Sequence, residues 1–373
     1  NLLNKAAVGT GRLTKAGAWG LLARLYLNAG VYRDRYAANF DLKASDMDQV
    51  ISYCDKIIAS NEYKLSNDYF SIFGDKNRDN SEIIFAVDQR PELNGHNRMA
   101  YFSLSGDQFP LPAFPAANGT DGPAITSDFY RTWVEANEGG DPTKDPRFYQ
   151  ENLKIYSTGV DTCVAGADFK INRGILRGQQ YGLIRVNGVF LKCADGKFKV
   201  GPLTNLTRNR PDKKVIFTEK VDFTPEGSDY PTGYRVEKYE FSAASNTGRN
   251  RGDADIIIVR LADVHLMRAE AQLRKNNAAA ALTDVNVVRS ARTLTKPAAP
   301  LSSITLDLLF RERGFEFYWE MLRRTDMVRF NKFEGTWTEK DNNDKNKRIF
   351  PIPQTAIDGA SNLVGYLVQN PGY

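Results

Sequence analysis

Histidine and cysteine are scarce in this 373-residue chain, which holds two histidines and three cysteines. The cysteines form no Cys-x-x-Cys pair, and neither a His-Glu-x-x-His nor a Gly-x-Ser-x-Gly motif occurs. We therefore expect no metal site, no cofactor and no thioredoxin-type redox site. Cys54 falls in a helical pattern and is expected to be a buried apolar residue. Cys163 and Cys193 could form a disulfide if the compartment is oxidising.

Long apolar runs and a strong charge of one sign are also missing. No segment approaches the roughly 18 to 20 apolar residues that a membrane-spanning helix needs. The sequence starts at Asn1 without a secretion leader, so we interpret it as a processed or partial chain. Its 50 basic and 45 acidic residues leave a net charge of +5. The densest basic run, at 208–214, is short and interrupted, which predicts a solvated loop and no nucleic-acid partner.

Two helices are predicted near the N-terminus, at residues 15–29 and 45–59. Thr14 is placed to cap the first helix and Gly30 to terminate it. The apolar face of the first helix has the large, large, small, large spacing of a tetratricopeptide-type hairpin. The residues on that face are Trp19, Leu22, Ala23 and Tyr26. The connection at 31–44 is longer than a standard repeat permits, so any repeat is degenerate.

The middle of the chain, residues 61–254, is predicted to be a loop-rich insertion with few short elements. Apolar and alternating runs predict strands at 82–87, 183–191 and 214–217. An amphipathic pattern predicts a helix at 126–137.

Helices return after the insertion. Residues 261–274 and 278–291 are predicted helices, and the Asn276-Asn277 turn between them is so short that they must pack as a hairpin. A third, longer helix is predicted at 306–328.

The whole chain, 1–373, is predicted to form one mainly α domain. It would have helical parts at 1–60 and 255–330 and an extended, proline-containing tail at 331–373.

Several segments, taken together, resemble the SusD/RagB family of nutrient-binding proteins. The Asp145-Pro146-Arg147 step, the helix from Arg260 to Ala271, and the ending with Phe350-Pro351-Ile352-Pro353-Gln354 are similar to family motifs. Further similar segments lie at 12–27, 81–85, 285–289, 311–329 and 369–373. Their order and spacing cover nearly the whole chain. One departure is the Trp319-Glu320-Met321-Leu322 step, where many members have a Phe-Glu-Gly-like sequence.

This resemblance implies a fold, a location and a partner. The fold would be a superhelix of tetratricopeptide-like helical hairpins with long irregular loop insertions and a few short strands. The full protein would be lipid-anchored on the extracellular face of a Bacteroidetes-type outer membrane, through an N-terminal anchor that this chain lacks. It would cap a TonB-dependent, SusC-like transporter, capture glycan or sometimes peptide, and have no catalytic residues.

Two other function classes stay open. Glu312, Glu316 and Glu320 lie one helical turn apart, and their repulsion would require neutralising arginines such as Arg313, Arg323, Arg324 and Arg329. We interpret them as an ion-paired structural helix. An all-helical carbohydrate-active enzyme would instead use a carboxylate pair such as Glu316 and Asp326. A protein-interaction module is the third possibility, because tetratricopeptide-like surfaces commonly bind proteins.

Aromatic residues in long polar loops are the candidate ligand contacts. Sugar rings present C–H faces that stack on aromatic rings, while polar groups reach the hydroxyls. Aromatics of this kind are Tyr101, Phe102, Phe109, Phe114, Tyr230, Tyr234 and Trp337. From these we predict a binding site of Tyr101, Phe102, Phe109, Tyr230 and Trp337. Tyr101 and Trp337 lead because each offers a ring face and a polar edge. The alternative is that these rings pin the loops to the helical body.

Overall fold

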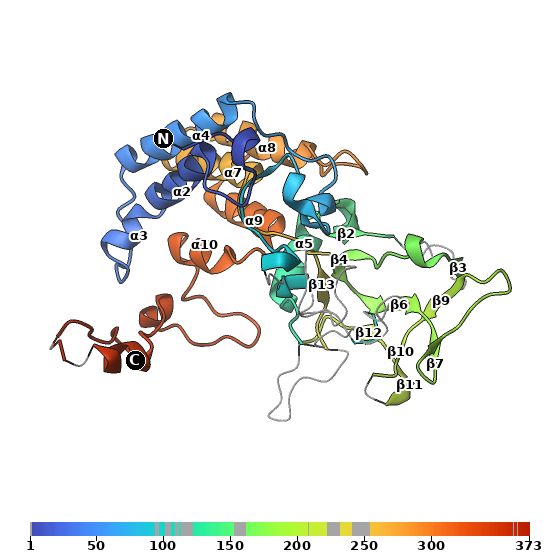
Figure 1. Cartoon of the computed structure of the whole chain (residues 1–373). Helices are drawn as coiled ribbons and strands as arrows, with labels where there is room; N and C mark the ends of the chain where they lie inside the picture. The colour runs from blue at the N-terminus through green and yellow to red at the C-terminus, as the bar shows by residue number, and fades with distance from the viewer. Residues whose placement is uncertain are drawn as a thin grey trace.

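Helices and short strands gather on opposite sides of the molecule, as Figure 1 shows. The computed structural model describes residues 2–93, 97–100, 106–108, 112, 122–152, 162–207, 209–221, 232–240, 254–360, 362–363 and 365–373. Among these residues no helix has the length and apolar character needed to span a membrane. The described part of the chain is rich in helices and has short strands, as the sequence predicts.

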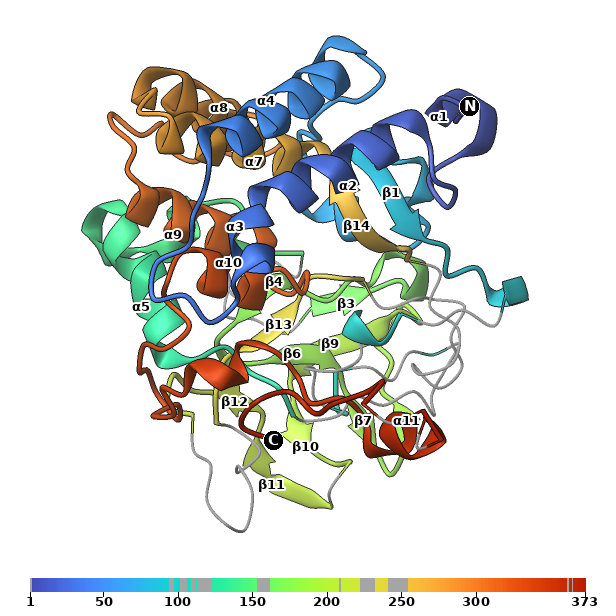
Figure 2. The same cartoon turned by 90° about the vertical axis from the view of Figure 1, so that its left-hand side faces the viewer.

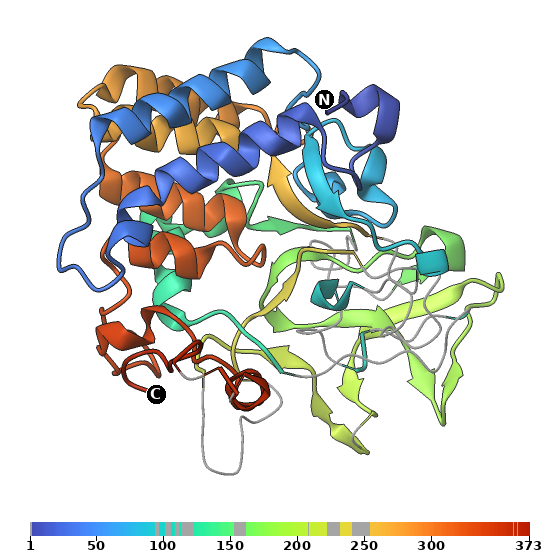
Figure 3. The ribbon, with the colours of Figure 1, turned by 60° about the vertical axis from the view of Figure 1, so that its left-hand side comes forward.

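Four helices pack side by side in the order α2, α4, α7 and α8 (Figure 3). Their bounds are α2 (Lys15–Leu27), α4 (Ala44–Ala59), α7 (Leu261–Arg274) and α8 (Ala278–Ser290). Thr14 caps α2 as predicted, because its Oγ1 accepts from the Gly17 amide at 3.1 Å. The end of α2 differs from the prediction, since Asn28 caps it and Gly30 lies within a short α3 (Ala29–Arg33).

A pair of strands packs closely against α2. β1 (Ile83–Val87) pairs with β14 (Ile256–Arg260) in antiparallel fashion, and both lie against α2 in Figure 2. A Cβ added at Gly20 of α2 would stand 2.7 Å from Cγ1 of Val259. Gly20 is therefore the residue that lets the helix sit on the strand.

The predicted single helix at 306–328 is wrong, because the structure divides it into α9 (Leu306–Phe317) and α10 (Arg323–Arg329). Trp319 and Met321 have φ values of 62° and 61°, in the left-handed region that stops a helix. The break directs Glu320 inward, where its carboxylate lies 2.7 Å from Lys238 Nζ. Buried ion pairing thus overrides the helical pattern of the sequence.

The strand side consists of small antiparallel sheets. One has the order β13-β4-β2, a second the order β3-β9-β6, and β12-β5, β10-β11 and β7-β8 are two-stranded. The bounds are β2 (Tyr149–Gln150), β3 (Thr162–Val164), β4 (Arg173–Leu176), β5 (Gly178–Gln179), β6 (Tyr181–Leu183), β7 (Arg185–Val186), β8 (Val189–Phe190), β9 (Phe198–Pro202), β10 (Thr204–Asn205), β11 (Arg210–Lys214), β12 (Ile216–Phe217) and β13 (Arg235–Glu237).

Two strand predictions need correction. Residues 183–191 form the end of β6 and a β7–β8 hairpin, because Asn187 and Gly188 adopt positive φ and reverse the chain. Residues 214–217 are divided between the end of β11 and β12. The backbone of Val215, between them, donates to the Leu203 carbonyl and accepts from the Gln180 amide.

The tail contains a helix that the sequence did not predict, whereas the helix predicted before the strand side is present. The tail at 331–373 is predicted to be extended but contains α11 (Gln354–Gly359), which Pro353 immediately precedes as the N-cap residue. The predicted helix at 126–137 is α5 (Ser127–Ala136), whose Trp133 is fully buried and stacks on Phe315 at 3.8 Å. A short α1 (Lys5–Val8) precedes α2.

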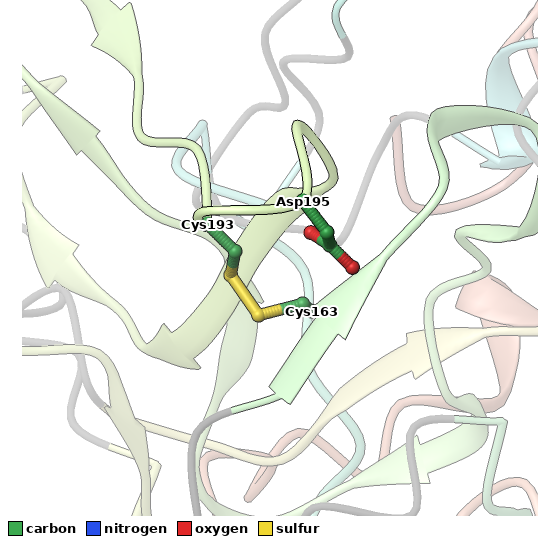
Figure 4. Close-up of side chains that lie close together, drawn as sticks. All are labelled: Cys163, Cys193 and Asp195. Atoms are coloured by element: carbon green, nitrogen blue, oxygen red, sulfur yellow. A yellow bond between two sulfur atoms is a disulfide. The ribbon is translucent and has the colours of Figure 1, made fainter.

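A disulfide joins Cys163 of β3 to Cys193 (Figure 4). Their Cα atoms are 6.2 Å apart, within the range that a disulfide accommodates. Cys54 is reduced and fully buried in the core between α2, α4 and α7. Asp195 lies beside the disulfide in Figure 4 and completes a cluster with the two sulfurs. The bridge leaves no thiolates there, so the cluster cannot act as a zinc ligand set.

Candidate functional site

A buried network of ion pairs, here called the ionic lattice, joins the helical side to the strand side. Arg260 at the end of β14 contacts carboxylates of Glu82, Glu316 and Glu320 at 2.7 to 2.9 Å. The other members are Asp145, Arg147, Lys238, Arg289, Arg292 and Glu312. All ten side chains are buried. Charges in this environment are stabilised only by mutual pairing, so the lattice holds six chain segments in one arrangement.

The prediction that Glu312, Glu316 and Glu320 are ion-paired structural residues is confirmed. They do not share one helix, because Glu320 lies in the break after α9, and the predicted neutralising arginines are wrong. Arg147, Arg260, Arg289 and Arg292, which are distant in sequence, supply the charge for the glutamates together with Lys238. Of the predicted cations, Arg313 and Arg329 pair with aspartates and Glu270. The arginines that pair with Glu312 and Glu316 lie far from them in the sequence, so proximity along the chain did not identify them.

The alternative catalytic pair, Glu316 and Asp326, has the wrong environment for glycoside hydrolysis. Burial alone would raise the pKa of Glu316, but Arg292, Arg260 and Arg147 outweigh it and hold that pKa well below the usual value. Arg313 and Arg329 likewise lower the pKa of Asp326 against the effect of burial. A glycosidase needs one carboxyl group that keeps its proton near neutral pH, and it must reach the sugar. Both groups are ionised and at most 1% exposed.

An open cleft of about 300 Å³ lies where β2, β4, β5 and β13 meet. Its lining combines tyrosine rings, an apolar floor and charged or polar side chains. The lining residues are Tyr149, Glu151, Ile175, Leu176, Arg177, Gly178, Gln180 and Tyr234. This volume is at the lower end of the range for small-ligand pockets, and one sugar unit fits that scale. We call it the tyrosine cleft.

The rings of the tyrosine cleft are fixed by elements on both sides. Tyr234 precedes β13, and its carbonyl accepts from the Ile125 amide at 3.1 Å. Its ring meets that of Tyr130 on α5 edge to face, with centroids 4.8 Å apart. Burial and the neighbouring Tyr130 raise the pKa of Tyr234, so its hydroxyl stays protonated at neutral pH and can both donate and accept.

Arg177 joins β4 to β5, lines the tyrosine cleft and lies over the buried ring of Phe148. Its guanidinium is 4.9 Å from the ring centroid of Phe148, and its Nη1 donates to the hydroxyl of Tyr130 at 3.0 Å. Gln180 holds the β4–β5 turn by donating to the Arg177 and Gly178 carbonyls, each at 3.0 Å. The cleft thus offers ring faces together with fixed donors, which are the two contacts a sugar needs.

Four of the five predicted ligand residues, Tyr101, Phe102, Phe109 and Tyr230, lie outside the described residues. Trp337 is described: it is half-buried in a turn, and Lys340 Nζ stands 4.4 Å from its ring centroid. Trp337 does not line the tyrosine cleft. Tyr234, singled out in the sequence only as a loop aromatic, does line it.

Sequence reasoning missed Tyr149, Arg177 and the supporting Tyr130. Tyr130 lies on a predicted helix, where an aromatic is normally core, and Arg177 lies in an irregular segment with no motif. The only available signal for Tyr149 was its position two residues after the Asp145-Pro146-Arg147 step, which the lattice buries.

A second cavity of about 760 Å³ lies on the helical side, between the loop at 61–67 and the α7–α8 hairpin. His265 lines it, as a buried side chain whose Nδ1 lies 2.8 Å from Asp284 Oδ1. His96 lies outside the described residues.

The helical layer, the buried ionic lattice and the tyrosine cleft together define a helix-rich protein with a small open cleft carried on short strands. The sequence profile of the SusD family matches residues 88–373, more than three quarters of the chain. The chain therefore belongs to the SusD family.

Known relatives share this assignment over most of the chain. The starch-binding protein SusD of Bacteroides thetaiotaomicron is 25% identical over 382 aligned residues, which cover 97% of this chain and 61% of that protein. This chain thus spans less than two thirds of that relative's length.

Solved structures show the same fold. Surface glycan-binding protein A from Bacteroides thetaiotaomicron, also solved with laminarihexaose, aligns with a TM-score of 0.61 at 20% identity. The alignment covers 99% of this chain and 66% of that one. A laminarin-binding SusD-like protein aligns with a TM-score of 0.55 at 17% identity, covering 97% of this chain and 63% of that one.

Proposed function

We propose that this chain is the glycan-capturing part of a cell-surface protein that delivers oligosaccharides to a TonB-dependent, SusC-like transporter. The observation that carries the proposal is the tyrosine cleft, with two tyrosine rings and a fixed arginine in an open pocket of about 300 Å³. Membership of the SusD family supports it, since relatives are named for binding starch, laminarin and laminarihexaose. In this proposal the protein lies on the extracellular face of the outer membrane, held by a lipid anchor.

The ligand contacts in this proposal are Tyr149, Arg177 and Tyr234 in the cleft. The loop aromatics Tyr101, Phe102, Phe109, Tyr230 and Trp337 stay predicted contacts that extend the site to further sugar units. The proposal also treats residues 1–373 as one domain whose helical hairpins form a tetratricopeptide-like superhelix. The side-by-side packing of α2, α4, α7 and α8 supports that description.

A purely capturing role is supported by the ionic lattice. Its carboxylates are buried and engaged by arginines, so they hold the fold together and have no contact with solvent sugars. Binding without hydrolysis needs ring faces and hydrogen-bond donors, and the cleft has both.

Affinity electrophoresis against starch, laminarin, xylan and polygalacturonate tests the proposal, with reducing ends assayed in the same samples. We expect retardation by at least one polymer without new reducing ends, and loss of retardation in Tyr234→Ala. The matched control is Tyr32→Ala, because Tyr32 is 60% exposed on α3 on the helical side. New reducing ends that disappear in a Glu316→Gln variant whose circular-dichroism spectrum matches that of the parent would replace capture with hydrolysis. Retardation that survives Tyr234→Ala would remove the tyrosine cleft from the site.

A further inference from the structure

The positive charge of this protein is concentrated in the strand-rich segment that carries the tyrosine cleft. Residues 162–221 contain 12 lysines and arginines and only 4 aspartates and glutamates. The rest of the chain holds 38 basic and 41 acidic residues, so it is slightly acidic. Several of the cations are exposed, namely Lys170, Lys192, Lys197, Lys213 and Lys214. A concentration of like charge on one lobe attracts ligands of the opposite sign.

Within the cleft itself, Arg177 differs from the arginines of the ionic lattice. Arg147, Arg260 and Arg292 each contact carboxylates at 2.6 to 3.2 Å. Arg177 is half-buried over Phe148, and among the described residues no carboxylate forms an ion pair with it. Its one hydrogen bond to a side chain of these residues uses Nη1, donating to Tyr130. A guanidinium has five N–H donors, so Arg177 retains donors for a ligand in the cleft.

From these two observations we infer that the ligand is an acidic glycan, whose carboxylate or sulfate group is bound by Arg177 in the tyrosine cleft. The inference rests on the proposed function and narrows its substrate class. A planar guanidinium pairs with a carboxylate or sulfate through two parallel hydrogen bonds, which a neutral sugar cannot offer. The rings of Tyr149 and Tyr234 contact the sugar faces on either side of that group.

Glu151 sets a direction within the cleft. It is exposed and lines the same pocket as Arg177, so it repels an acidic group and accepts hydrogen bonds from sugar hydroxyls. An acidic sugar is therefore oriented with its charged group toward Arg177 and its hydroxyls toward Glu151.

Matched polymer pairs that differ only in charge test this inference. The pairs are polygalacturonate with its carboxyl-reduced form, and sulfated laminarin with laminarin, titrated calorimetrically at low and high salt. We expect the acidic member of at least one pair to bind about tenfold tighter or more than its neutral partner. The preference should shrink as salt rises, because ions screen the attraction.

Variants at Arg177 separate the cleft from the general charge of the lobe. Arg177→Gln should weaken binding of the acidic member at least tenfold more than binding of the neutral member, so that the preference is lost, and Arg177→Lys should restore part of it. Lys213→Gln with Lys214→Gln removes two exposed charges of β11 and should leave the preference intact. An equal loss in the β11 variant would overturn the assignment to Arg177.

The inference and the proposed function fail differently. Equal binding of both members of each pair, lost in Tyr234→Ala, would overturn the acidic specificity and leave glycan capture standing. No binding to polygalacturonate, laminarin or their charge-altered partners would count against both the acidic specificity and the proposed glycan capture. A circular-dichroism melt of each variant shows whether a loss reflects unfolding, and Arg177→Lys keeps the test valid if Arg177→Gln fails to fold.

Discussion

Arg260 Nη1 and Glu316 Oε1 lie 2.7 Å apart, and both side chains are buried between the helices and the strands. Arg260 is the last residue of β14, and Glu316 is near the end of α9. Their contact therefore fixes the position of a helix of the C-terminal part on the strand pair that also carries α2. The pair is the centre of the ionic lattice, and its removal should lower the stability of the whole fold.

Glu316→Gln should lower the free energy of unfolding by about 3–5 kcal/mol, because it leaves Arg147, Arg260 and Arg292 buried with one charge fewer between them. Urea denaturation followed by circular dichroism measures the change. Glu138→Gln is the control, since Glu138 is exposed and stands 3.7 Å from Lys144 at the surface. That control should stay within about 0.5 kcal/mol of the parent. A mild effect of Glu316→Gln would show that the lattice is dispensable.

Acid should destabilise the protein in a defined window. Arginine partners outweigh burial and lower the pKa values of Glu82, Asp263, Glu270, Glu316 and Asp326 below those of free carboxyls. Carboxylates in the unfolded chain take up protons near pH 4, so their stabilising effect is complete above that pH and is lost as the pH falls further. Urea midpoints should be level from about pH 7 to 5 and fall steeply below about pH 4. A fall that begins near pH 6 would implicate other groups.

Met321→Gly should raise the free energy of unfolding by about 0.5–1 kcal/mol. Met321 has a φ of 61°, which costs an L side chain about 1–2 kcal/mol and glycine nothing, although glycine loses more entropy on folding. The side chain is 65% exposed, so little packing is lost. The thermal midpoint measures the gain. Met321→Ala removes the same contacts without relieving φ and should show no gain.

Reduction of the Cys163–Cys193 disulfide should destabilise the strand side. The bridge closes a loop with a sequence separation of 30, and the loss of that constraint costs about 3–4 kcal/mol in the chain-entropy account. Unfolding with and without a phosphine reductant measures it. The Cys163→Ala, Cys193→Ala double variant should match the reduced parent and ignore the reductant. A reductant effect that persists in the double variant would point to another cause.

Trp337→Ala should weaken glycan binding with little loss of stability, because the ring is half-buried in a surface turn and its face is covered by Lys340. Lys340→Ala uncovers the same ring and should leave binding equal or tighter. Calorimetric titration with the polymer retained by the parent measures both. Unchanged affinity in Trp337→Ala would exclude Trp337 from the site and leave the tyrosine cleft as its described part.

Local signals in the sequence predicted the elements they govern. Thr14 marks the start of α2, and the Asn276-Asn277 turn marks the α7–α8 hairpin, because caps and tight turns depend on neighbouring residues. The break at Trp319 was not predictable from periodicity. It is caused by Lys238 and Arg260, which lie 82 and 60 residues away from Glu320.

The candidate site was predictable only in kind. Loop aromatics were the right residue type, and Tyr234 is one of them, but the cleft also needs Tyr149 of β2 and Arg177, which follows β4. Their meeting depends on the pairing of β4 with both β2 and β13, which is a long-range property of the folded chain.

The ionic lattice has a consequence for how this protein can be rebuilt. Arg147 and Lys238 flank the sheet of the tyrosine cleft in the sequence. The side chains of both contact α9 or the glutamate that follows it. A strand-rich insertion transplanted from a relative would therefore fold here only if it brought an arginine and a lysine to those two positions. Between them, an exchange that alters ligand preference would have to keep Ile175 and Val236, because both lie in the same buried core as Phe315 of α9.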